Sequence, residues 1–494
     1  MSKSKNALYL THQIRLCEQH AIDELGISQE LLMRRAGTAA FNTLTSLYPD
    51  VRDIAVFCGG GNNAGDAYVL ARLAHEEGFS VLLVQCKEIE QLPPVAQIMA
   101  RDAASSGVPC KSFDDVSLCE AELIVDGLLG IGLKGTVQGQ IALAIQFIND
   151  SQQPVLSLDI PSGLDADLGC VMGLCVRASV TVTFMAEKIG LYILDGPDHA
   201  GKVICHSLQA AAGLASLSPA AYRLDDTAFH GIMPSRLKNS HKGDYGHVLI
   251  IGGGLGMPGA TYLTALAALR VGAGSVTIAT RPEYAESVLP GLPEVMIHGV
   301  DEIDSLKSLL SKATISVIGP GLGEDEWAQS LFATTIAAQV PLVIDASALR
   351  LLAKQPQHDD NWILTPHPGE AASLLACSTS DIQKNRHQAV QQIQQQYGGC
   401  VVLKGCGTVV NTGEPVSYIC TSGNPGMATA GMGDVLSGVI GGLLAQGILL
   451  SDAAKLGVWL HARAADEAVL SLGERGLMAS DLMPYLRRQI NQCS

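Results

Sequence analysis

The sequence predicts an α/β protein with two domains, each a three-layer α/β/α unit on a mostly parallel sheet. Its 494 residues are 47% hydrophobic and include 52 glycines, but only 4% are aromatic, so the cores must consist of Ala, Val, Leu and Ile. Short apolar runs ending in Gly, Asp or His alternate with helical patterns along both halves. An uncharged, Ala/Ser-rich stretch at residues 210–221 divides the chain near residue 220, giving domains 1–220 and 221–494.

The bulk composition argues against several classes of partner. A net charge of −16 disfavours binding to nucleic acid or to an anionic membrane. The 13 cysteines include no C-x-x-C pair, which predicts reduced thiols in a cytoplasmic protein. Residues 1–20 lack the apolar run of a secretory signal, and residues 435–450 are too short to span a bilayer, so we expect a buried helix there. The apolar fraction suggests a buried interface between copies, hence a homo-oligomer.

The first half begins with a helical pattern at residues 11–48 and continues as alternating strands and helices. Strands are predicted at residues 54–57, 81–85, 123–126, 155–159 and 180–184, the last of them closing this half, and a helix at residues 67–77. The first strand leads into the Gly-rich stretch 58–66. Open α/β sheets bind ligands at the carboxyl ends of their strands, so this turn is a candidate binding loop.

Polar side chains cluster at three strand ends of the first half. They are Asn62, Asn63, Asp66, Asp126, Asp159 and Ser162. A single Asp at a strand end often only caps the next helix, but three such ends at one sheet edge indicate a shared pocket. Residues 59–64 also fit the dinucleotide fingerprint G-x-G-x-x-G/A, although no clear acidic residue ends the second strand to hold a ribose.

The second half repeats the alternation with different motifs. Strands are predicted at residues 248–251, 276–279, 315–318, 342–344, 363–364 and 400–403, and a helix from residue 258 to about 271. Lys404 stands between a strand and two glycines, which suits a point charge for a phosphate, and Thr408 adds a hydroxyl. His367 lies between two prolines and either contacts a ligand or simply fills a turn.

Residues 424–438 form the strongest candidate site. A loop of small residues enters a helix near Gly431, and Gly431 and Gly433 lack a Cβ, so a ligand can approach bare backbone. The unpaired first amides and the helix dipole suit phosphoryl oxygens. Because a carboxylate binds phosphate poorly, we assign Asp434 as the base that takes a proton from a substrate hydroxyl. Taken alone, the stretch fits equally well an Asp in a first helical turn beside packing glycines.

Several motifs in order resemble one known family over nearly the whole chain. The second half resembles the ADP/ATP-dependent NAD(P)H-hydrate dehydratases, which have a ribokinase-like fold. The matching stretches are residues 241–247, 256–260, 270–274, 319–323, 365–370, 404–408 and 424–437. The first half resembles the NAD(P)H-hydrate epimerases, with a Rossmann-like fold, at residues 61–66, 125–126, 130–135 and 159–164. The order of the halves is that of the bifunctional, Nnr-type NAD(P)H-hydrate repair enzymes.

The resemblance implies repair of hydrated NADH and NADPH, called NADHX and NADPHX. Residues 1–220 would interconvert the R and S epimers. Residues 221–494 would dehydrate the S epimer using ADP or ATP, releasing AMP or ADP and phosphate. Mg²⁺ would accompany the nucleotide, and Asn63, Asp126 and Ser162 would bind K⁺.

The resemblance also implies individual roles. Asp434 and Asp159 would be the catalytic residues. The adenine nucleotide would contact Lys404, Gly405, Cys406, Gly407, Thr408 and Gly433. The hydrated dinucleotide would contact Ala260, Gly321, His367 and Asp434 in the second half. In the first half it would contact Asn62, Asn63, Ala64, Gly65, Asp66, Gly130, Ile131, Gly132, Leu133, Lys134, Gly135, Thr136 and Asp159.

The sequence departs from the family pattern at three positions. Ala64 and Ala67 replace glycines of the epimerase loop, and a positive φ at either position would strain an alanine. Ser347 stands where the dehydratases more usually carry Asp. The residues also leave three other functions open: a ribokinase-like small-molecule kinase with a nucleotide-sensing first domain, a hydride-transferring dehydrogenase, and a first half that binds nucleotide without turnover.

Overall fold

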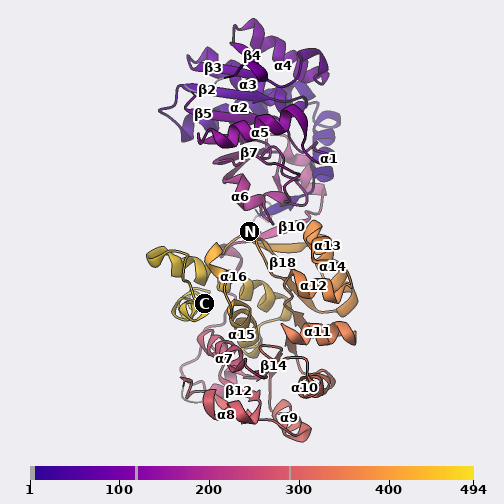
Figure 1. Ribbon diagram of the computed structural model, residues 1–494, viewed down its shortest axis with the longest axis vertical. Coiled ribbons are helices and arrows are strands. Elements are labelled where there is room, and N and C mark those ends of the chain that lie inside the picture. Colours follow the sequence, from indigo (N-terminus) through magenta and orange to yellow (C-terminus); the bar gives the residue numbers. More distant parts are fainter. Residues whose placement is uncertain (1–5, 117–120, 289–290, 494) are drawn as a thin grey trace. The chain divides into compact units, whose positions relative to one another are not determined.

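The computed structural model describes residues 6–116, 121–288 and 291–493 (Figure 1). The chain divides into two compact units, Met1–Tyr222 and Arg223–Ser494. Each unit has hydrophobic clusters of its own. Within the described ranges, no helix combines the length and the apolar character needed to cross a membrane.

The first unit alternates strands and helices along its length. Its strands are β1 (Ala7–Tyr9), β2 (Asp53–Cys58), β3 (Ser80–Gln85), β4 (Cys110–Ser112), β5 (Leu123–Gly127), β6 (Val155–Leu158), β7 (Val180–Phe184), β8 (Glu187–Lys188) and β9 (Lys202–His206). Its helices are α1 (Thr11–Asp23), α2 (Gln29–Leu47), α3 (Asn62–Glu76), α4 (Pro94–Ser105), α5 (Gly139–Asp150) and α6 (Gly196–Ala200). The 3₁₀ helix η4 (Ala211–Ser216) and strand β10 (Ala221–Leu224) follow.

A parallel sheet with the strand order β4-β3-β2-β5-β6-β7-β9 forms the centre of the first unit. Val56 of β2 packs with α2, α3 and α4 on one face, while its neighbour Phe57 packs with α5 on the other. The order of the strands reverses between β2 and β5, so the crevice at their carboxyl ends is the expected ligand site of such a sheet. Separately, β1 pairs with β8, which sets Tyr9 opposite Lys188.

Three expectations for the first unit need correction. Residues 11–48 form two helices rather than one, because Gly26 adopts a φ of 64° and the Ser28 hydroxyl caps α2 by accepting the N–H of Leu31. Helix α3 begins at Asn62, inside the stretch that was expected to be loop. The strand at residues 180–184 is not the last, because β9 pairs with it in parallel; its half-exposed residues hide it from a search for apolar runs.

The second unit has the same alternation. Its strands are β11 (His247–Ile251), β12 (Ser275–Thr280), β13 (Met296–Gly299), β14 (Ile315–Ile318), β15 (Leu342–Ile344), β16 (Trp362–Leu364), β17 (Cys400–Leu403), β18 (Thr408–Asn411) and β19 (Ser417–Cys420). Its helices are α7 (Pro258–Arg270), α8 (Pro282–Val288), α9 (Ile303–Leu310), α10 (Glu326–Ala337), α11 (Ser347–Lys354), α12 (Pro368–Leu374), α13 (Thr379–Lys384), α14 (Arg386–Tyr397), α15 (Met432–Ala445), α16 (Leu450–Leu472) and α17 (Met483–Ile490).

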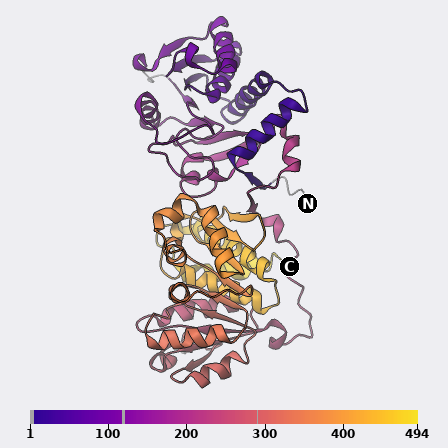
Figure 2. The ribbon, with the colours of Figure 1, turned by 90° about the vertical axis from the view of Figure 1, so that its right-hand side faces the viewer.

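These strands follow the order β13-β12-β11-β14-β15-β16-β17-β18-β19, parallel as far as β17 and antiparallel beyond it. Val248 and Ile250 pack with α7, α15, α16 and α17, whereas Leu249 and Ile251 are buried on the opposite face. Both faces of the sheet are therefore covered, which makes this unit a three-layer structure (Figures 1 and 2). The strand order reverses between β11 and β14.

Helix α15 is buried along almost its whole length, which confirms the prediction of a buried helix from residue 435 onward; it ends at Ala445. It lies directly against α7: a Cβ at Gly438 would come 2.1 Å from the carbonyl oxygen of Thr264. Only glycine permits that approach. The close packing fixes the direction of α15 and therefore the position of its N-terminus.

Strands β13, β18 and β19 are not evident from the sequence pattern. β13 is largely exposed and carries His298 in place of an apolar run. β18 and β19 form a short antiparallel hairpin after Lys404, where parallel strands were expected to stop. None of the cysteines in the described ranges forms a disulfide.

Candidate active sites

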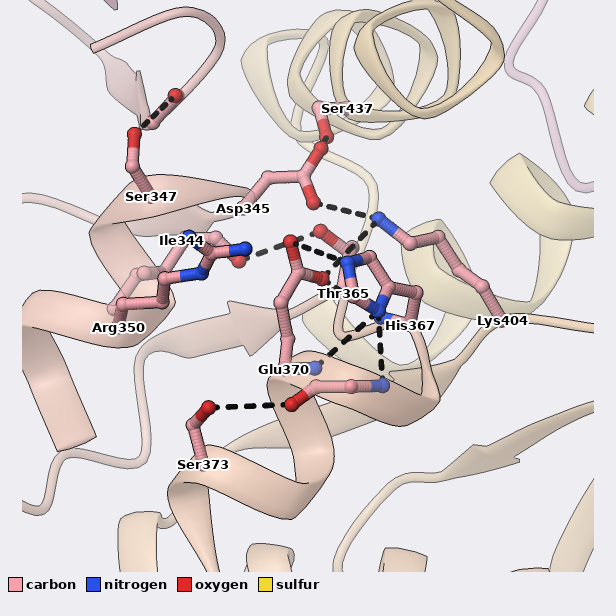
Figure 3. Close-up of polar contacts among 12 residues, drawn as sticks. Ile344, Asp345, Ser347, Arg350, Thr365, His367, Glu370, Ser373, Lys404 and Ser437 are labelled. Carbon is pink, nitrogen blue, oxygen red and sulfur yellow. Dashed lines mark hydrogen bonds and ion pairs between the residues drawn. The ribbon is translucent and has the colours of Figure 1, made fainter. Parts of the chain in front are cut away.

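Loops after the strands of the second unit bring charged side chains together (Figure 3). Asp345 follows β15 and Lys404 follows β17, and the Lys404 ammonium lies 2.7 Å from Oδ1 of Asp345. The carboxylate of Glu370, on α12, lies 3.8 Å from the same ammonium. The hydroxyl of Ser437, on α15, donates to Oδ2 of Asp345 at 2.7 Å. Lys404 is thus held between two carboxylates.

The charges in this cluster support one another. Burial opposes the ionisation of Asp345, but Lys404 and the Ser437 hydroxyl together lower its pKa. Burial likewise opposes the charge of Lys404, but Asp345 and Glu370 raise its pKa. Burial raises the pKa of Glu370, although the charge of Lys404 acts to lower it. Asp345 and Lys404 consequently form a charged, hydrogen-bonded pair beneath the start of α15.

The first turn of α15 is open to a ligand. Gly431 is its N-cap residue, with a φ of 88° that favours glycine. Within the described ranges, no protein group accepts the backbone N–H of Gly431, Met432, Gly433 or Asp434. A Cβ at Gly433 would lie 3.4 Å from the Lys404 ammonium, so the bare backbone here faces that cation. Four free amides, a helix dipole and a nearby ammonium together suit a phosphoryl group.

Asp434 stands in this turn as an acid without a fixed partner. Its carboxylate makes no hydrogen bond or ion pair with another described residue. Burial and the neighbouring Asp345 raise the pKa of Asp434 to about 7, with Lys404 acting in the opposite direction. A carboxyl group with that pKa can take up a proton near neutral pH, as a general base must.

The predicted dinucleotide contacts of this unit lie at or near the same sheet edge. Gly321, with a φ of 60°, faces the start of α7: a Cβ there would come 3.1 Å from the Cβ of Ala260. His367 caps α12, because its Nδ1 accepts the N–H of Gly369 at 2.9 Å. Burial and the charge of Lys404 lower the pKa of His367, which keeps its ring neutral.

Two further positions hold the loops in place. Thr408 donates its hydroxyl to the carbonyl of Gly405 at 3.0 Å, so that hydroxyl shapes its own loop. Ser347, which replaces the more usual Asp, accepts the N–H of Gly323 at 3.0 Å and donates to the carbonyl of Gly319 at 3.3 Å. The serine therefore ties α11 to the loop that carries Gly321.

In the first unit, Asp126 and Ser162 form one buried polar group at the ends of β5 and β6. Asp126 is fully buried and accepts hydrogen bonds from the Ser162 hydroxyl at 2.5 Å, the Ser162 amide at 2.9 Å and the Ser157 hydroxyl at 2.8 Å. Burial raises the pKa of Asp126 in spite of these donors. Asn63 donates to the carbonyls of Leu129 and Leu158, which leaves its buried Oδ1 without a partner among the described residues.

Asp159 is paired with a lysine that the sequence analysis missed. The Lys188 ammonium is fully buried and lies 2.5 Å from the Asp159 carboxylate, and it also donates to Thr183 Oγ1 and the Phe184 carbonyl at 2.8 Å. Asp159 itself has a φ of 65°, a conformation rare for a non-glycine residue and frequent at functional sites. No sequence signal marks Lys188, because it ends the two-residue strand β8 and belongs to no motif considered.

Asn63 and Asp159 line a cavity of about 690 Å³ at the carboxyl ends of β2 and β5, where the strand order reverses. Most of the predicted contacts line it: Asn62, Asn63, Asp66, Gly130, Ile131, Gly132, Leu133, Lys134 and Asp159. Glu18 of α1, which was not predicted, lines it as well. Burial and the charge of Asp159 raise the pKa of both Glu18 and Asp66, so the cavity holds several acidic groups that compete for protons.

Four predicted contacts do not line this cavity. Ala64 is fully buried in the core behind it, and Gly65 is buried against Met33, whose sulfur would lie 2.2 Å from an added Cβ. Gly135 and Thr136 also lie outside the lining. Ala64 and Ala67 both belong to helix α3 without a positive φ, so neither alanine strains the loop. The Cβ of Ala67 instead packs against Gly127.

Comparison with known proteins connects both units to one family. Residues 248–488 match the family model described as NAD(P)H-hydrate dehydratase, and residues 29–190 match that of the YjeF-related protein N-terminus. The bifunctional NAD(P)H-hydrate repair enzyme Nnr of Coxiella burnetii is 46% identical over 98% of this chain and 99% of its own length. The enzyme of the same name from Escherichia coli K12 is 40% identical over 98% and 94%.

Solved structures support the fold of the second unit. A ribokinase-like superfamily protein from Enterococcus faecalis aligns with a TM-score of 0.51 and 28% identity, covering 55% of this chain and 96% of its own. A protein from Streptococcus mutans aligns with a TM-score of 0.51 and 32% identity, covering 55% and 99%. The three-layer unit described above is therefore ribokinase-like.

Proposed function

The chain belongs to the family of bifunctional NAD(P)H-hydrate repair enzymes, and we propose from this that its two units carry the two activities of the repair. The first unit, in the cavity beside Asp159, interconverts the R and S epimers of NADHX and NADPHX. The second unit dehydrates the S epimer at the N-terminus of α15. The observation that carries the proposal is Asp434, an unpaired acid with a pKa of about 7 beside four free amides.

In the dehydration, the difficulty is the leaving group. The hydrated nicotinamide ring carries a hydroxyl at C6 beside the ring nitrogen, and hydroxide leaves poorly. Asp434 takes the proton of that hydroxyl while the hydroxyl oxygen attacks the terminal phosphorus of ADP or ATP. The bond between this phosphorus and the departing AMP or ADP breaks. The ring nitrogen then expels phosphate, and loss of a proton from C5 restores NADH or NADPH.

The surrounding groups supply position and charge. The amides of residues 431–434 stabilise the transferring phosphoryl group, each such donor being worth about 3 kcal/mol in comparable sites. The residues at 404–408 and Gly433 bind the adenine nucleotide, and Ala260, Gly321 and His367 hold the dinucleotide. Asp345 and Glu370 both lie against Lys404, so an Mg²⁺ ion would enter with the nucleotide and would offset the charge of its phosphates.

In the epimerisation, Asp159 relays a proton as the hydroxyl leaves C6 and returns on the opposite face of the ring. Lys188 holds this carboxylate in its unusual backbone position. The neighbouring polar group fits a monovalent cation, because Asn63 Oδ1 is buried without a partner among the described residues and Asp126 is a buried acid. We assign K⁺ to Asn63, Asp126 and Ser162, where it would offset the charge of Asp126.

One experiment tests the proposal against its alternatives. The purified chain is mixed with racemic NADHX with and without ADP, and NADH absorbance, the two epimers, AMP and phosphate are followed. We expect epimer interconversion without ADP, and NADH, AMP and phosphate in equal amounts with it. A stable phosphorylated product without free phosphate would instead identify a small-molecule kinase, and an ADP-independent, reversible oxidation of NADH would identify a dehydrogenase.

A further inference from the structure

A fully buried arginine lies directly behind the loop at residues 404–408. Arg386, the first residue of α14, is 1% exposed. One of its terminal nitrogens, Nη2, donates to the carbonyls of Leu403 at 3.1 Å and Lys404 at 3.2 Å, with a longer contact of 3.5 Å to the carbonyl of Gly407. A buried guanidinium without a carboxylate partner is costly, so its contacts with this loop must compensate for the burial.

The contacts of Arg386 engage the carbonyl that ends β17 and two carbonyl oxygens of the loop. The carbonyls of Leu403, Lys404 and Gly407 face the guanidinium, and the carbonyl of Gly405 accepts the Thr408 hydroxyl. By contrast, no described protein group accepts the backbone N–H of Gly405 or Gly407. The loop is therefore polarised: the carbonyls of Lys404, Gly405 and Gly407 have partners within the protein, whereas these two amides remain available.

The backbone of Gly405 lies in close contact with the guanidinium of Arg386. Its φ is 140°, and an added Cβ would lie 2.7 Å from Nη1 of Arg386. Any side chain there would displace the guanidinium or the loop. The contact is thus specific to a glycine lying flat against a planar cation.

We infer that Arg386 is a positioning residue for the nucleotide site of the dehydratase unit. By holding the carbonyls of the loop inward, it leaves the amides of Gly405 and Gly407 free for the oxygens of the adenine nucleotide. Its charge lies behind the loop and adds a positive potential that favours an anionic ligand. The inference rests on the proposed function, because it takes residues 404–408 as the nucleotide-binding loop.

The test compares Arg386→Gln and Arg386→Lys with a matched control, Gln383→Ala. Gln383 accepts a hydrogen bond from Nη1 of Arg386 at 3.0 Å but contributes nothing to the loop carbonyls. Arg386→Gln removes the charge and the planar set of N–H donors, whereas Arg386→Lys keeps the charge but loses that planar set of donors. The KM values for ADP and for S-NADHX, the kcat, the affinity for ADP by calorimetry and the epimerase activity of the same preparation are measured.

We expect Arg386→Gln to raise the KM and Kd for ADP by about tenfold or more, since several charged hydrogen bonds are lost. The KM for S-NADHX should change by less than about twofold, and the epimerase activity of the other unit should remain at the wild-type level. Arg386→Lys should fall between wild type and Arg386→Gln, and Gln383→Ala should bind ADP like wild type.

Two results would overturn the inference. One is an unchanged affinity for ADP in an Arg386→Gln protein that unfolds cooperatively like wild type. The other is a parallel loss in both KM values and kcat with no rescue by lysine, which indicates general damage to the unit. If instead the wild-type protein itself neither binds ADP nor needs it, the proposed function fails, and that outcome is read from the wild-type arm alone.

Discussion

At the scale of single residues, the dehydration depends on the environment of one carboxylate. Asp434 is held close to Asp345, so two negative charges compete, and burial adds to the cost of ionising Asp434. Asp345 has Lys404 and Ser437 as partners, whereas Asp434 has no hydrogen-bond or ion-pair partner among the residues that the structure describes. In the proposed mechanism the two acids have different roles: Asp345 stays ionised and holds Lys404, whereas Asp434 exchanges a proton.

The first prediction concerns the side chain of Asp434. Asp434→Asn keeps the shape of the first turn of α15, but the amide cannot accept the hydroxyl proton. We therefore expect kcat for dehydration to fall by at least about 10²-fold. The affinity for ADP should remain near the wild-type value, because the amides that bind phosphate are unchanged. Steady-state kinetics and calorimetry measure the two quantities. Near-normal turnover would remove Asp434 from its assigned role.

The second prediction follows from the pKa of the same group. A general base must be ionised to act, so kcat for dehydration should rise about tenfold per pH unit below pH 7 and level off above it, reflecting the pKa of about 7. A pH profile of kcat at saturating ADP measures this. The residual rate of Asp434→Asn serves as the control and should lack the same ionisation. A flat wild-type profile between pH 5.5 and 8, as an approximate range around that pKa, contradicts the assignment.

The third prediction concerns Asp159 in the first unit. Asp159→Ala removes the proton relay and leaves Lys188 without its carboxylate, so epimer interconversion should fall to the spontaneous rate. Chromatography of the two epimers over time measures it. Dehydration of pure S-NADHX by the same variant provides the control and should proceed normally. Enzymatic interconversion at the wild-type rate would show that Asp159 is not the relay.

At the scale of elements, α15 acts through its N-terminus, and its buried body holds that end in place. The close approach to α7 at Gly438 sets where the free amides point. Gly433 then keeps the space in front of them clear. Its Cβ would stand 3.4 Å from the Lys404 ammonium, an ordinary contact that causes no clash but occupies the side on which a phosphoryl group would approach.

The fourth prediction contrasts two glycines at opposite ends of this helix. Gly433→Ala should fold normally but lower kcat/KM for ADP by about tenfold, because its methyl group intrudes on the phosphoryl position. Gly447, just beyond the helix end, has a φ of 82° and open space around it, so Gly447→Ala should lower Tm through backbone strain and leave the kinetics unchanged. Calorimetry and kinetics separate the two effects. The reverse pattern would contradict the proposed position of the nucleotide.

At the scale of the whole molecule, each of the two units carries its own group of acidic side chains. The acids of the first unit line a cavity built only from that unit, and those of the second surround α15. The S epimer made by one unit can therefore reach the other by diffusion. The repair of a racemic substrate requires both activities, but it does not require them in the same copy of the chain.

The fifth prediction uses this independence. The Asp159→Ala protein should dehydrate the S epimer of racemic NADHX quickly. It should use the R epimer only as fast as that epimer converts spontaneously to S. An equimolar mixture of the Asp159→Ala and Asp434→Asn proteins should convert both epimers to NADH. The rate should be close to that of wild type at the same concentration of functional sites of each kind. Incomplete complementation at high protein concentration would indicate instead that the epimer passes directly between the units.

Most of the elements could be predicted from the sequence because most of the strands are short apolar runs, many of them followed by Gly or Asp. Strands such as β2 and β14 were predicted to within one residue for this reason. β9, β13 and the β18–β19 hairpin were missed because their residues are polar or half-exposed, and their strand character comes from pairing with neighbours. The break between α1 and α2 depends on one left-handed glycine inside an otherwise continuous helical pattern.

By itself the sequence determined the chemistry available at each strand end, since the glycines, acids and lysine of a loop are local to it. Only the tertiary structure decided which of these groups meet. Lys404 and Asp345 are 59 residues apart, and Ser437 and Asp345 are 92 apart, yet each pair is hydrogen-bonded. Lys188 and Arg386 belong to no motif considered and acquire their roles only through burial against Asp159 and the loop at residues 404–408. Parallel strands separated by long crossovers bring their ends to one edge, and sequence spacing does not record which ends become neighbours.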